Sequence, residues 1–256
     1  MTGLDLAVRT TVALTVLAAV AGLVPLAVGV RQGRAVVVAG VRAAVQLGAV
    51  GLVLGAVFRA PLAVLPVLAV MLVTVVATVG PRLARLPVAG RRRRPLAIAA
   101  GALAGTVVTA AVVFGTGALH LDARNAVALG GITLGGTMTA STLAGRRFLA
   151  ELRARRDEVA GKLALGATMR RSTDDLVATA VREALVPALD QTRTTGLVTL
   201  PGAFVGALLG GASPLAAGRF QLVVLLGLLA AQSVAAVVLL YLLAEVPFLP
   251  PDAIDG

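Results

Sequence analysis

Long, uninterrupted runs of apolar residues dominate the pattern of this chain. A helix that crosses a bilayer needs about 20 consecutive apolar residues. Stretches of about this length cover residues 10–30, 35–57, 61–79, 95–119, 126–143, 186–210 and 220–243. The fifth stretch is the shortest, so six spans are the alternative to seven. The pattern predicts an all-α, polytopic membrane protein in which residues 1–256 form a single transmembrane domain.

Residues 146–182 are the one extended polar segment, and they separate the fifth stretch from the sixth. Apolar residues recur in this segment at helical spacing, so that four of them share one face: Phe148, Leu152, Val159 and Leu163. Gly166 can end such a helix in the left-handed conformation, and Thr168 can cap a second helix. We therefore predict a hairpin of two helices. Its apolar stripe needs a docking partner, which a soluble protein would supply, whereas a solvated loop is the alternative.

The basic residues are distributed unevenly among the loops between the apolar stretches. Loops rich in Lys and Arg tend to stay in the cytoplasm. The loops after the first, third and fifth stretches hold most of the 23 basic residues. With seven spans this places the N-terminus outside, and the hairpin and the C-terminus in the cytoplasm, at the cell inner (plasma) membrane. The first stretch is too long for a signal peptide and is expected to be retained.

The formal net charge of +11 also has to be weighed as a sign of nucleic-acid binding. The basic residues lie between apolar stretches, and aromatic residues for base stacking make up only 3% of the chain. We therefore predict no nucleic-acid partner. Contact with anionic headgroups of the lipid bilayer explains the arginine run at 91–94.

The residue inventory excludes several kinds of active site. A P-loop needs a lysine followed by Ser or Thr, but Leu163 follows the only lysine, Lys162. The chain has no cysteine, and its single histidine, His120, lies in a predicted outside loop, so neither a metal cluster nor a catalytic dyad can be built around it. We predict that the chain is not an enzyme and holds no cofactor and no metal. ATP hydrolysis, if any, belongs to another chain.

Polar residues within or near the apolar stretches are candidates for a translocation pathway, because a charge buried in lipid is costly. Arg42 and Gln46 lie one turn apart, and Asp190 shares a helix face with Arg193. With neighbouring neutral groups, the candidates are Arg42, Gln46, Thr139, Asp190, Gln191, Arg193 and Thr195. A structural role is equally open, since long side chains snorkel, an Asp–Arg pair neutralises itself and hydroxyls bond to their own helix.

Glycines at four-residue spacing favour close helix packing, which is how helices associate in lipid. The fifth stretch has two such residues, Gly131 and Gly135, and the sixth has three, Gly202, Gly206 and Gly210. We expect these two helices to pack against neighbours or across a dimer axis.

Three segments resemble the FetB-like permeases of ABC transporters, whose bacterial members are linked to iron export and whose plant relatives are linked to aluminium tolerance. The most characteristic is GKLALGATMRRSTDDLVATAVREALVPALDQTRTTGLVTLPG at 161–202. The others are GGASPLAAGRFQLVV at 210–224 and VRAAVQLGAVGLVL at 41–54. The resemblance implies a permease subunit that exports metal ions or another small solute. It also implies a homodimer that works with two copies of a separate ATPase subunit.

The turn LGAT at 165–168 is similar to the coupling loop with which permeases of ABC importers dock on the ATPase. By this resemblance, the coupling residues are Leu163, Ala164, Leu165, Gly166, Ala167 and Thr168. The family often has Glu at position 161 and Pro at position 169, where this chain has Gly161 and Met169.

A further stretch, GGITLGGTMTA at 130–140, also matches the family, and its retained Met138 joins the candidate pathway. The family often has Asn in place of Gly136 and Met in place of Ile132. These replacements remove two possible metal ligands, and this loss weakens the inference that iron is the cargo.

Two other functions are compatible with the apolar pattern. An ion-gradient-driven secondary transporter is expected to show inverted repeats and a carboxylate at mid-membrane. No clear repeat is visible, and Asp190 lies near the end of a predicted span. A non-transporting regulatory membrane subunit of an ABC complex would carry the same hairpin.

Overall fold

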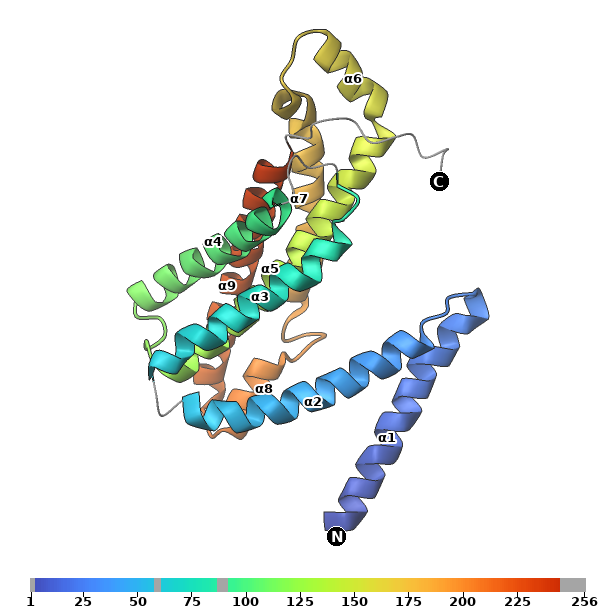
Figure 1. The fold of residues 1–256 in the computed structure, drawn as a ribbon. Coiled ribbons are helices and arrows are strands. Elements are labelled where there is room, and N and C mark those ends of the chain that lie inside the picture. Colours follow the sequence, from blue (N-terminus) through green and yellow to red (C-terminus); the bar gives the residue numbers. More distant parts are fainter. Residues whose placement is uncertain (1–2, 58–60, 87–91, 245–256) are drawn as a thin grey trace. The chain divides into compact units, whose positions relative to one another are not determined.

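The computed structural model describes residues 3–57, 61–86 and 92–244, and the chain is helical almost throughout these ranges (Figure 1). No strand occurs within them. Six of the described helices are long and apolar enough to cross a membrane. The predicted all-α, polytopic membrane fold is therefore confirmed. Arg91 of the arginine run and the end of the chain after Ala244 lie outside the described residues.

The chain divides into two compact units, Met1–Ala60 and Pro61–Gly256. The first unit is a helical hairpin formed by α1 (Gly3–Leu23), the short 3-10 helix η1 (Val24–Val28) and α2 (Gly33–Val57). The two long helices come closest at their joined ends, where a Cβ atom on Gly22 would lie 3.1 Å from the Cα atom of Gly33.

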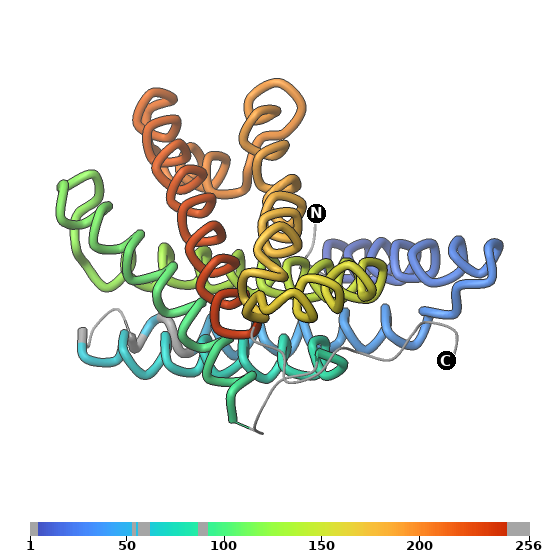
Figure 2. The backbone as a smooth tube through the Cα atoms, turned by 90° about the horizontal axis from the view of Figure 1, so that it is seen from above, coloured from blue at the N-terminus to red at the C-terminus, as the bar shows by residue number. Residues whose placement is uncertain are grey.

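The second unit is a bundle of long helices with two short ones. Its elements are η2 (Pro61–Ala63), α3 (Val64–Arg82), α4 (Arg93–Gly115), α5 (Ala123–Ala154), α6 (Arg156–Ala164), α7 (Met169–Thr194), α8 (Gly202–Leu209) and α9 (Pro214–Leu243). The last helix, α9, packs against α4, α5, α7 and α8. Figure 2 shows α7 and α9 as neighbours, with the start of α7 at the end of α9.

Helix α4 and helix α9 approach closely through two glycines of α4. A Cβ atom on Gly101 would lie 2.8 Å from the carbonyl oxygen of Ala235, and one on Gly105 would collide with the carbonyl oxygen of Ala231. One turn further along α4, the buried Thr109 hydroxyl donates a 3.1 Å hydrogen bond to the carbonyl oxygen of Gly227. Small residues and an interhelical hydrogen bond thus join these two apolar helices, as is common in membranes.

The glycines predicted to mediate packing are placed differently. A Cβ atom on Gly135, Gly202 or Gly206 would meet no neighbouring atom of the described chain within 4 Å, apart from its own helix. One on Gly131 would make an ordinary contact with Met71, and one on Gly210 would meet only carbonyl oxygens of α8. Packing of these glycines across a dimer axis therefore stays a prediction.

The predicted span at 186–210 is wrong as a single helix. Its first part is the end of α7, and its last part is the separate short helix α8. Gly196 has a φ of +86°, which a helix does not allow, and Pro201 disfavours the helical conformation at the residue before it. The other predicted spans, the short fifth one included, each coincide with one long helix. The six long apolar helices of the described chain thus match the alternative prediction in number, but the stretch that drops out is the sixth and not the fifth.

A cluster of buried side chains lies where α3, α5 and α9 end and where α4 and α7 begin. Its largest members are fully buried: Leu83, Ile98, Phe148, Leu152, Leu176, Leu239, Leu240 and Leu243. At the same end, the Arg170 guanidinium lies 3.4 Å from the centre of the Tyr241 ring, and Arg93 Nε donates to the Leu242 carbonyl oxygen over 3.0 Å. The first contact fixes the start of α7 against the end of α9, and the second fixes the start of α4 against the same end.

Candidate functional site

The hairpin predicted at 146–182 is formed by the end of α5, by α6 and by the start of α7. The turn between α6 and α7 has the hydrogen bonds of a Schellman motif: the Gly166 amide donates to the Leu163 carbonyl oxygen over 2.9 Å, and the Ala167 amide donates to that of Lys162 over 3.0 Å. Gly166 has a φ of +88°, and the Thr168 hydroxyl accepts from the Arg171 amide over 3.3 Å. The predicted glycine stop and threonine cap are therefore confirmed.

The apolar stripe of the hairpin is covered by the protein's own chain. Phe148, Leu152 and Val159 are buried in the cluster described above, and Leu163 packs against it. The expectation that a soluble partner must cover this stripe is therefore wrong. The reason is that α5 does not end with the predicted span at residue 143 but continues to Ala154, so the stripe stays next to α7.

One large apolar side chain of the described hairpin does remain uncovered. Leu165, at the tip of the turn, is 89% exposed. Ala164, Gly166 and Thr168 beside it are exposed as well, whereas Ala167 is half-buried. The tip therefore presents a small apolar knob that is held in place by a rigid turn.

Four charged side chains connect α6 to α7 behind this tip. The Arg155 guanidinium lies 2.7 Å from Glu158 and 2.5 Å from Asp175. The Lys162 ammonium lies 2.9 Å from Glu158 and 3.3 Å from Asp175. Each cation thus bridges both acids. Exposed ion pairs contribute little singly, but a closed network restrains the angle between two helices.

This network shifts the protonation of its acids. Hydrogen bonds from Arg155, and then from Lys162, lower the pKa of Glu158 to about 2. Partial burial by itself raises the pKa of Asp175, but hydrogen bonds from the same two cations outweigh this effect and keep the pKa below its usual value. Both acids are therefore charged at neutral pH.

A cavity of about 280 Å³ lies between α5, α7 and α9, within the second unit. Each helix contributes one polar side chain to its wall: Thr139, Gln191 and Gln232, respectively. Gly136 leaves room for this arrangement, because a Cβ atom at this position would lie 2.9 Å from Gln232 Nε2 and would collide with Leu228. The cavity is therefore lined by neutral hydrogen-bonding groups among apolar ones.

The structure brings together only some of the predicted pathway residues. Thr139 and Gln191 line the cavity, together with Gly135 from the predicted glycine pair. Asp190 is exposed and pairs with Arg193 over 3.5 Å. Thr195 donates to the Gln191 carbonyl oxygen of its own helix over 2.6 Å. Met138 lies outside the cavity wall and packs against the buried cluster instead.

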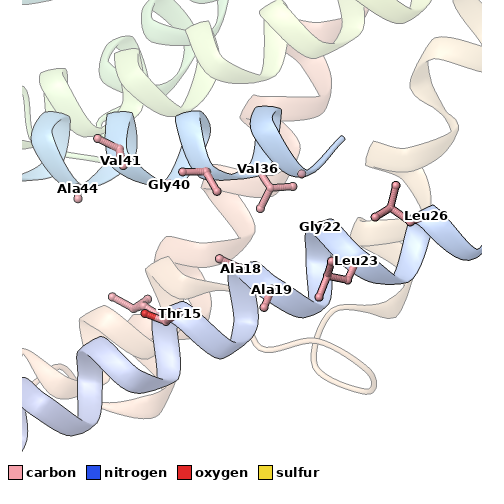
Figure 3. A pocket seen from close by; sticks show the side chains of 13 residues that line it. Thr15, Ala18, Ala19, Gly22, Leu23, Leu26, Val36, Gly40, Val41 and Ala44 are labelled. Carbon is pink, nitrogen blue, oxygen red and sulfur yellow. The ribbon is translucent and has the colours of Figure 1, made fainter. Parts of the chain in front are cut away.

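The other two predicted pathway residues, Arg42 and Gln46, belong to the first unit. Both are exposed on α2. A groove of about 670 Å³ lies between α1 and α2, and it is lined by apolar and small residues such as Ala18, Gly22 and Val36 (Figure 3). Neither Arg42 nor Gln46 contributes to this groove.

Several residues of the cavity between α5, α7 and α9 were not predicted from the sequence, and Gln232 and Pro187 are the most informative of them. Gln232 is one of two buried amides in the long apolar helix α9, with Gln221, and is 7% exposed, so a polar side chain among apolar neighbours was the available signal. Pro187 lies inside α7 and also lines the cavity. A proline in a helix leaves the carbonyl four residues earlier without its helical hydrogen bond, which weakens α7 beside the cavity.

Two of the positions that depart from the FetB-like pattern, Ile132 and Gly136, line this cavity. Among the described residues, no group of three or more His, Asp or Glu side chains lies close enough together to hold a metal ion. The single histidine, His120, is exposed in the turn before α5, as predicted.

Comparison with protein families matches residues 8–248 to a family described as "Uncharacterised protein family (UPF0014)". The chain belongs to the UPF0014 family. This UPF0014 chain is 31% identical over 203 residues to the UPF0014 membrane protein YjkA of Bacillus subtilis (strain 168), an alignment that covers 79% of this chain and 80% of YjkA. No solved structure matches the chain.

Two further relatives match the chain. The UPF0014 membrane protein STAR2 of Oryza sativa subsp. japonica is 33% identical over 78% of this chain and 70% of its own length. The probable iron export permease protein FetB of Escherichia coli (strain K12) is 29% identical over 54% of this chain and 53% of its own length. The predicted membership in the FetB-like family is therefore confirmed.

Proposed function

We propose that this UPF0014 chain is the permease subunit of an ABC-type transporter, and that a separate ATPase subunit docks on the tip of the α6–α7 hairpin. The observation that carries the proposal is the 89% exposure of Leu165 at that tip. A large apolar side chain held out by a rigid turn has the form of an interface anchor, which gains free energy when it enters a pocket of a partner. Leu163, Ala164, Gly166, Ala167 and Thr168 complete the proposed contact.

The hairpin is joined to the cavity by continuous helices. Helix α5 carries Thr139 in the cavity wall and continues to Ala154 at the hairpin. Helix α7 begins beside the tip at Met169 and reaches the cavity at Gln191. Arg147 of α5 holds them together, at 2.9 Å from Glu183 of α7. When ATP-driven closure of the ATPase pushes the tip, both helices carry the displacement to the cavity and alternate its access.

The proposal includes the wider assembly and its place in the cell. By the resemblance to FetB-like permeases, two copies of this chain work with two ATPase subunits in the inner (plasma) membrane. In the second unit, the end that carries the hairpin also carries Arg82, Arg94 and Arg146. This concentration of positive charge supports a cytoplasmic position for the hairpin.

The cargo passes through the cavity between α5, α7 and α9 in this proposal. Its walls offer one hydroxyl and two amides, which suit a hydrated metal ion or a small polar solute. The name of the FetB relative suggests iron. Transport assays with several metal ions and small organic solutes, in vesicles that contain the chain and its ATPase, decide between them.

The test of the proposal is the docking of the ATPase. The candidate partner is a soluble chain with a P-loop, which is to be sought in the reading frame next to that of this protein. Its binding and ATPase activity are measured with the chain in nanodiscs. Leu165→Asp is expected to cost about 2 kcal/mol or more of binding free energy, roughly 30-fold in Kd, because a charge replaces the apolar anchor.

Leu121→Asp is the matched control, since Leu121 is 74% exposed in the turn before α5, away from the hairpin. This variant is expected to bind and to stimulate the ATPase like the wild type. Equal binding by the Leu165→Asp and Leu121→Asp variants would refute the docking site. Transport driven by a proton or sodium gradient without ATP would refute the ABC assignment itself.

A further inference from the structure

Four arginines surround a second cavity, of about 340 Å³, in the second unit. Arg82 comes from the last turn of α3, and Arg85 from the turn that follows. Arg146 and Arg153 lie two turns apart on one face of α5, with Leu149 and Ala150 between them. Two segments far apart in the sequence thus direct positive charge into one space.

The positive charge of this cavity is not neutralised by the described part of the chain. None of the four guanidiniums pairs with a carboxylate there, and Arg82 makes only a long hydrogen bond of 3.4 Å to the Thr142 hydroxyl. The nearest acid in sequence, Glu151, is held by Arg147 at 2.7 Å. The cavity therefore has a strong field for an anion and free guanidinium donors to bind it.

The cavity also lies where an apolar helix ends. Helix α3 is long and apolar enough to cross a membrane, and it exposes Val70 and Val73 along its length. Arg82 and Arg85 follow directly at its end. An amphiphile with a charged head at the arginines can therefore lay its acyl chains along α3.

We propose that this four-arginine cavity binds a phosphate group, and that the phosphate is that of an anionic phospholipid headgroup at the membrane surface. One guanidinium group can donate two parallel hydrogen bonds to two oxygens of the same phosphate, whereas a lysine ammonium acts as a point charge. Arginine is therefore better suited than lysine to bind a phosphate group. Basic pockets between membrane helices are known to hold anionic headgroups. A zwitterionic headgroup brings its own cation and is bound more weakly. The site does not depend on the proposed transport function.

The test uses the full chain, purified in a neutral detergent and titrated with phosphatidylglycerol or phosphatidylcholine while bound lipid is counted by native mass spectrometry. The variant R85Q/R146Q/R153Q removes three of the four charges. The control variant R171Q/R182Q/R219Q removes three exposed arginines elsewhere, so the net charge is the same. Phosphatidylglycerol is expected to bind the wild type and the control alike, and the first variant at least about tenfold more weakly.

A parallel titration with inorganic phosphate distinguishes the source of the group. Its readout is the melting temperature of the purified chain. The headgroup is supported as the source of the phosphate if phosphatidylglycerol saturates the site at concentrations where inorganic phosphate leaves this melting temperature unchanged. Stabilisation by inorganic phosphate through the same arginines identifies a free phosphate instead and overturns the lipid assignment. Equal lipid affinity of both triple variants overturns the site.

If the R85Q/R146Q/R153Q variant does not fold, the single variants R85Q and R146Q are compared with R171Q, because these three side chains are exposed and unpaired in the described chain.

Discussion

The Arg170 guanidinium lies 3.4 Å from the centre of the Tyr241 ring. Arg170 belongs to the first turn of α7, just after the hairpin tip, and Tyr241 to the last turn of α9. The cation and the face of the ring attract each other across the two helices. Helix α9 is thereby tied to the segment that we propose to move with the ATPase.

Tyr241 variants test this tie. Replacing Tyr241 by Leu removes the ring and is expected to destabilise the second unit by about 0.5–1 kcal/mol, the usual size for an exposed cation–π pair. Tyr241→Phe keeps the ring and should retain most of the stability. Thermal unfolding in detergent measures both variants. An equal loss for Phe and Leu would show that the hydroxyl, rather than the ring, makes the contact.

The turn at the hairpin tip depends on one backbone conformation. Gly166 has a φ of +88°, so Gly166→Ala is expected to cost about 1 kcal/mol and to loosen the turn that holds Leu165. Gly161 lies inside α6 with free space around it, so Gly161→Ala should instead stabilise that helix by about 0.5–1 kcal/mol. Hydrogen exchange of residues 156–168 measures both. The same direction of change in the two variants would contradict this account.

The ion network behind the tip predicts a pH dependence. The pKa of Glu158 is lowered from 4.5 to about 2 in the folded chain, so its contribution to stability is complete above pH 4.5 and is lost as the pH falls through about 2. The low pKa of Asp175 acts in the same direction. We expect protection of the α6 amides, corrected for intrinsic exchange, to decrease over this range.

Two variants isolate the network in that measurement. Glu158→Gln should lower the protection at neutral pH and remove much of its pH dependence, because it removes the group that titrates. Asp174→Asn changes an exposed acid next to Asp175 and should leave the profile unchanged. If both variants behave alike, the decrease of α6 amide protection at low pH does not come from this ion network.

The buried amide of Gln232 should matter for transport more than for folding. Gln232→Leu keeps a similar volume but removes a hydrogen-bonding group from the cavity, so we expect transport to fall at least about tenfold, since one lost hydrogen bond is worth roughly 1–2 kcal/mol. Ser233→Ala is the control, because the Ser233 hydroxyl bonds within α9 to the Leu229 carbonyl oxygen over 2.8 Å. Stimulation of the ATPase should persist in both variants. Unchanged transport by Gln232→Leu would remove the cavity from the pathway.

Sequence reasoning succeeded where structure is decided locally. The Gly166 stop and the Thr168 cap depend on a few neighbouring residues, and both were predicted correctly. It failed at 186–210, because the apolar residues after Gly196 look like part of a span, although Gly196 and Pro201 interrupt the helix. The prediction of a single span there followed the apolar composition and disregarded the conformational effects of Gly196 and Pro201.

Tertiary contacts were beyond the reach of the sequence pattern. Gly101 and Gly105 have the same four-residue spacing as Gly202 and Gly206, but only the first pair meets another backbone in the described chain. Likewise, Gln232 became a candidate only when α9 was seen to pack beside α5 and α7. Spacing shows which residues share a helix face, but it does not show what that face meets.

The position of Tyr241 also has an optical consequence. The chain contains one tyrosine and no tryptophan, so its ultraviolet emission arises from a single ring when it is excited at wavelengths that its six phenylalanines do not absorb. That ring is covered by the Arg170 guanidinium, next to the turn that we expect an ATPase to contact. A displacement of the hairpin changes the surroundings of the fluorophore directly. The protein therefore carries a built-in, label-free reporter of its own proposed movement.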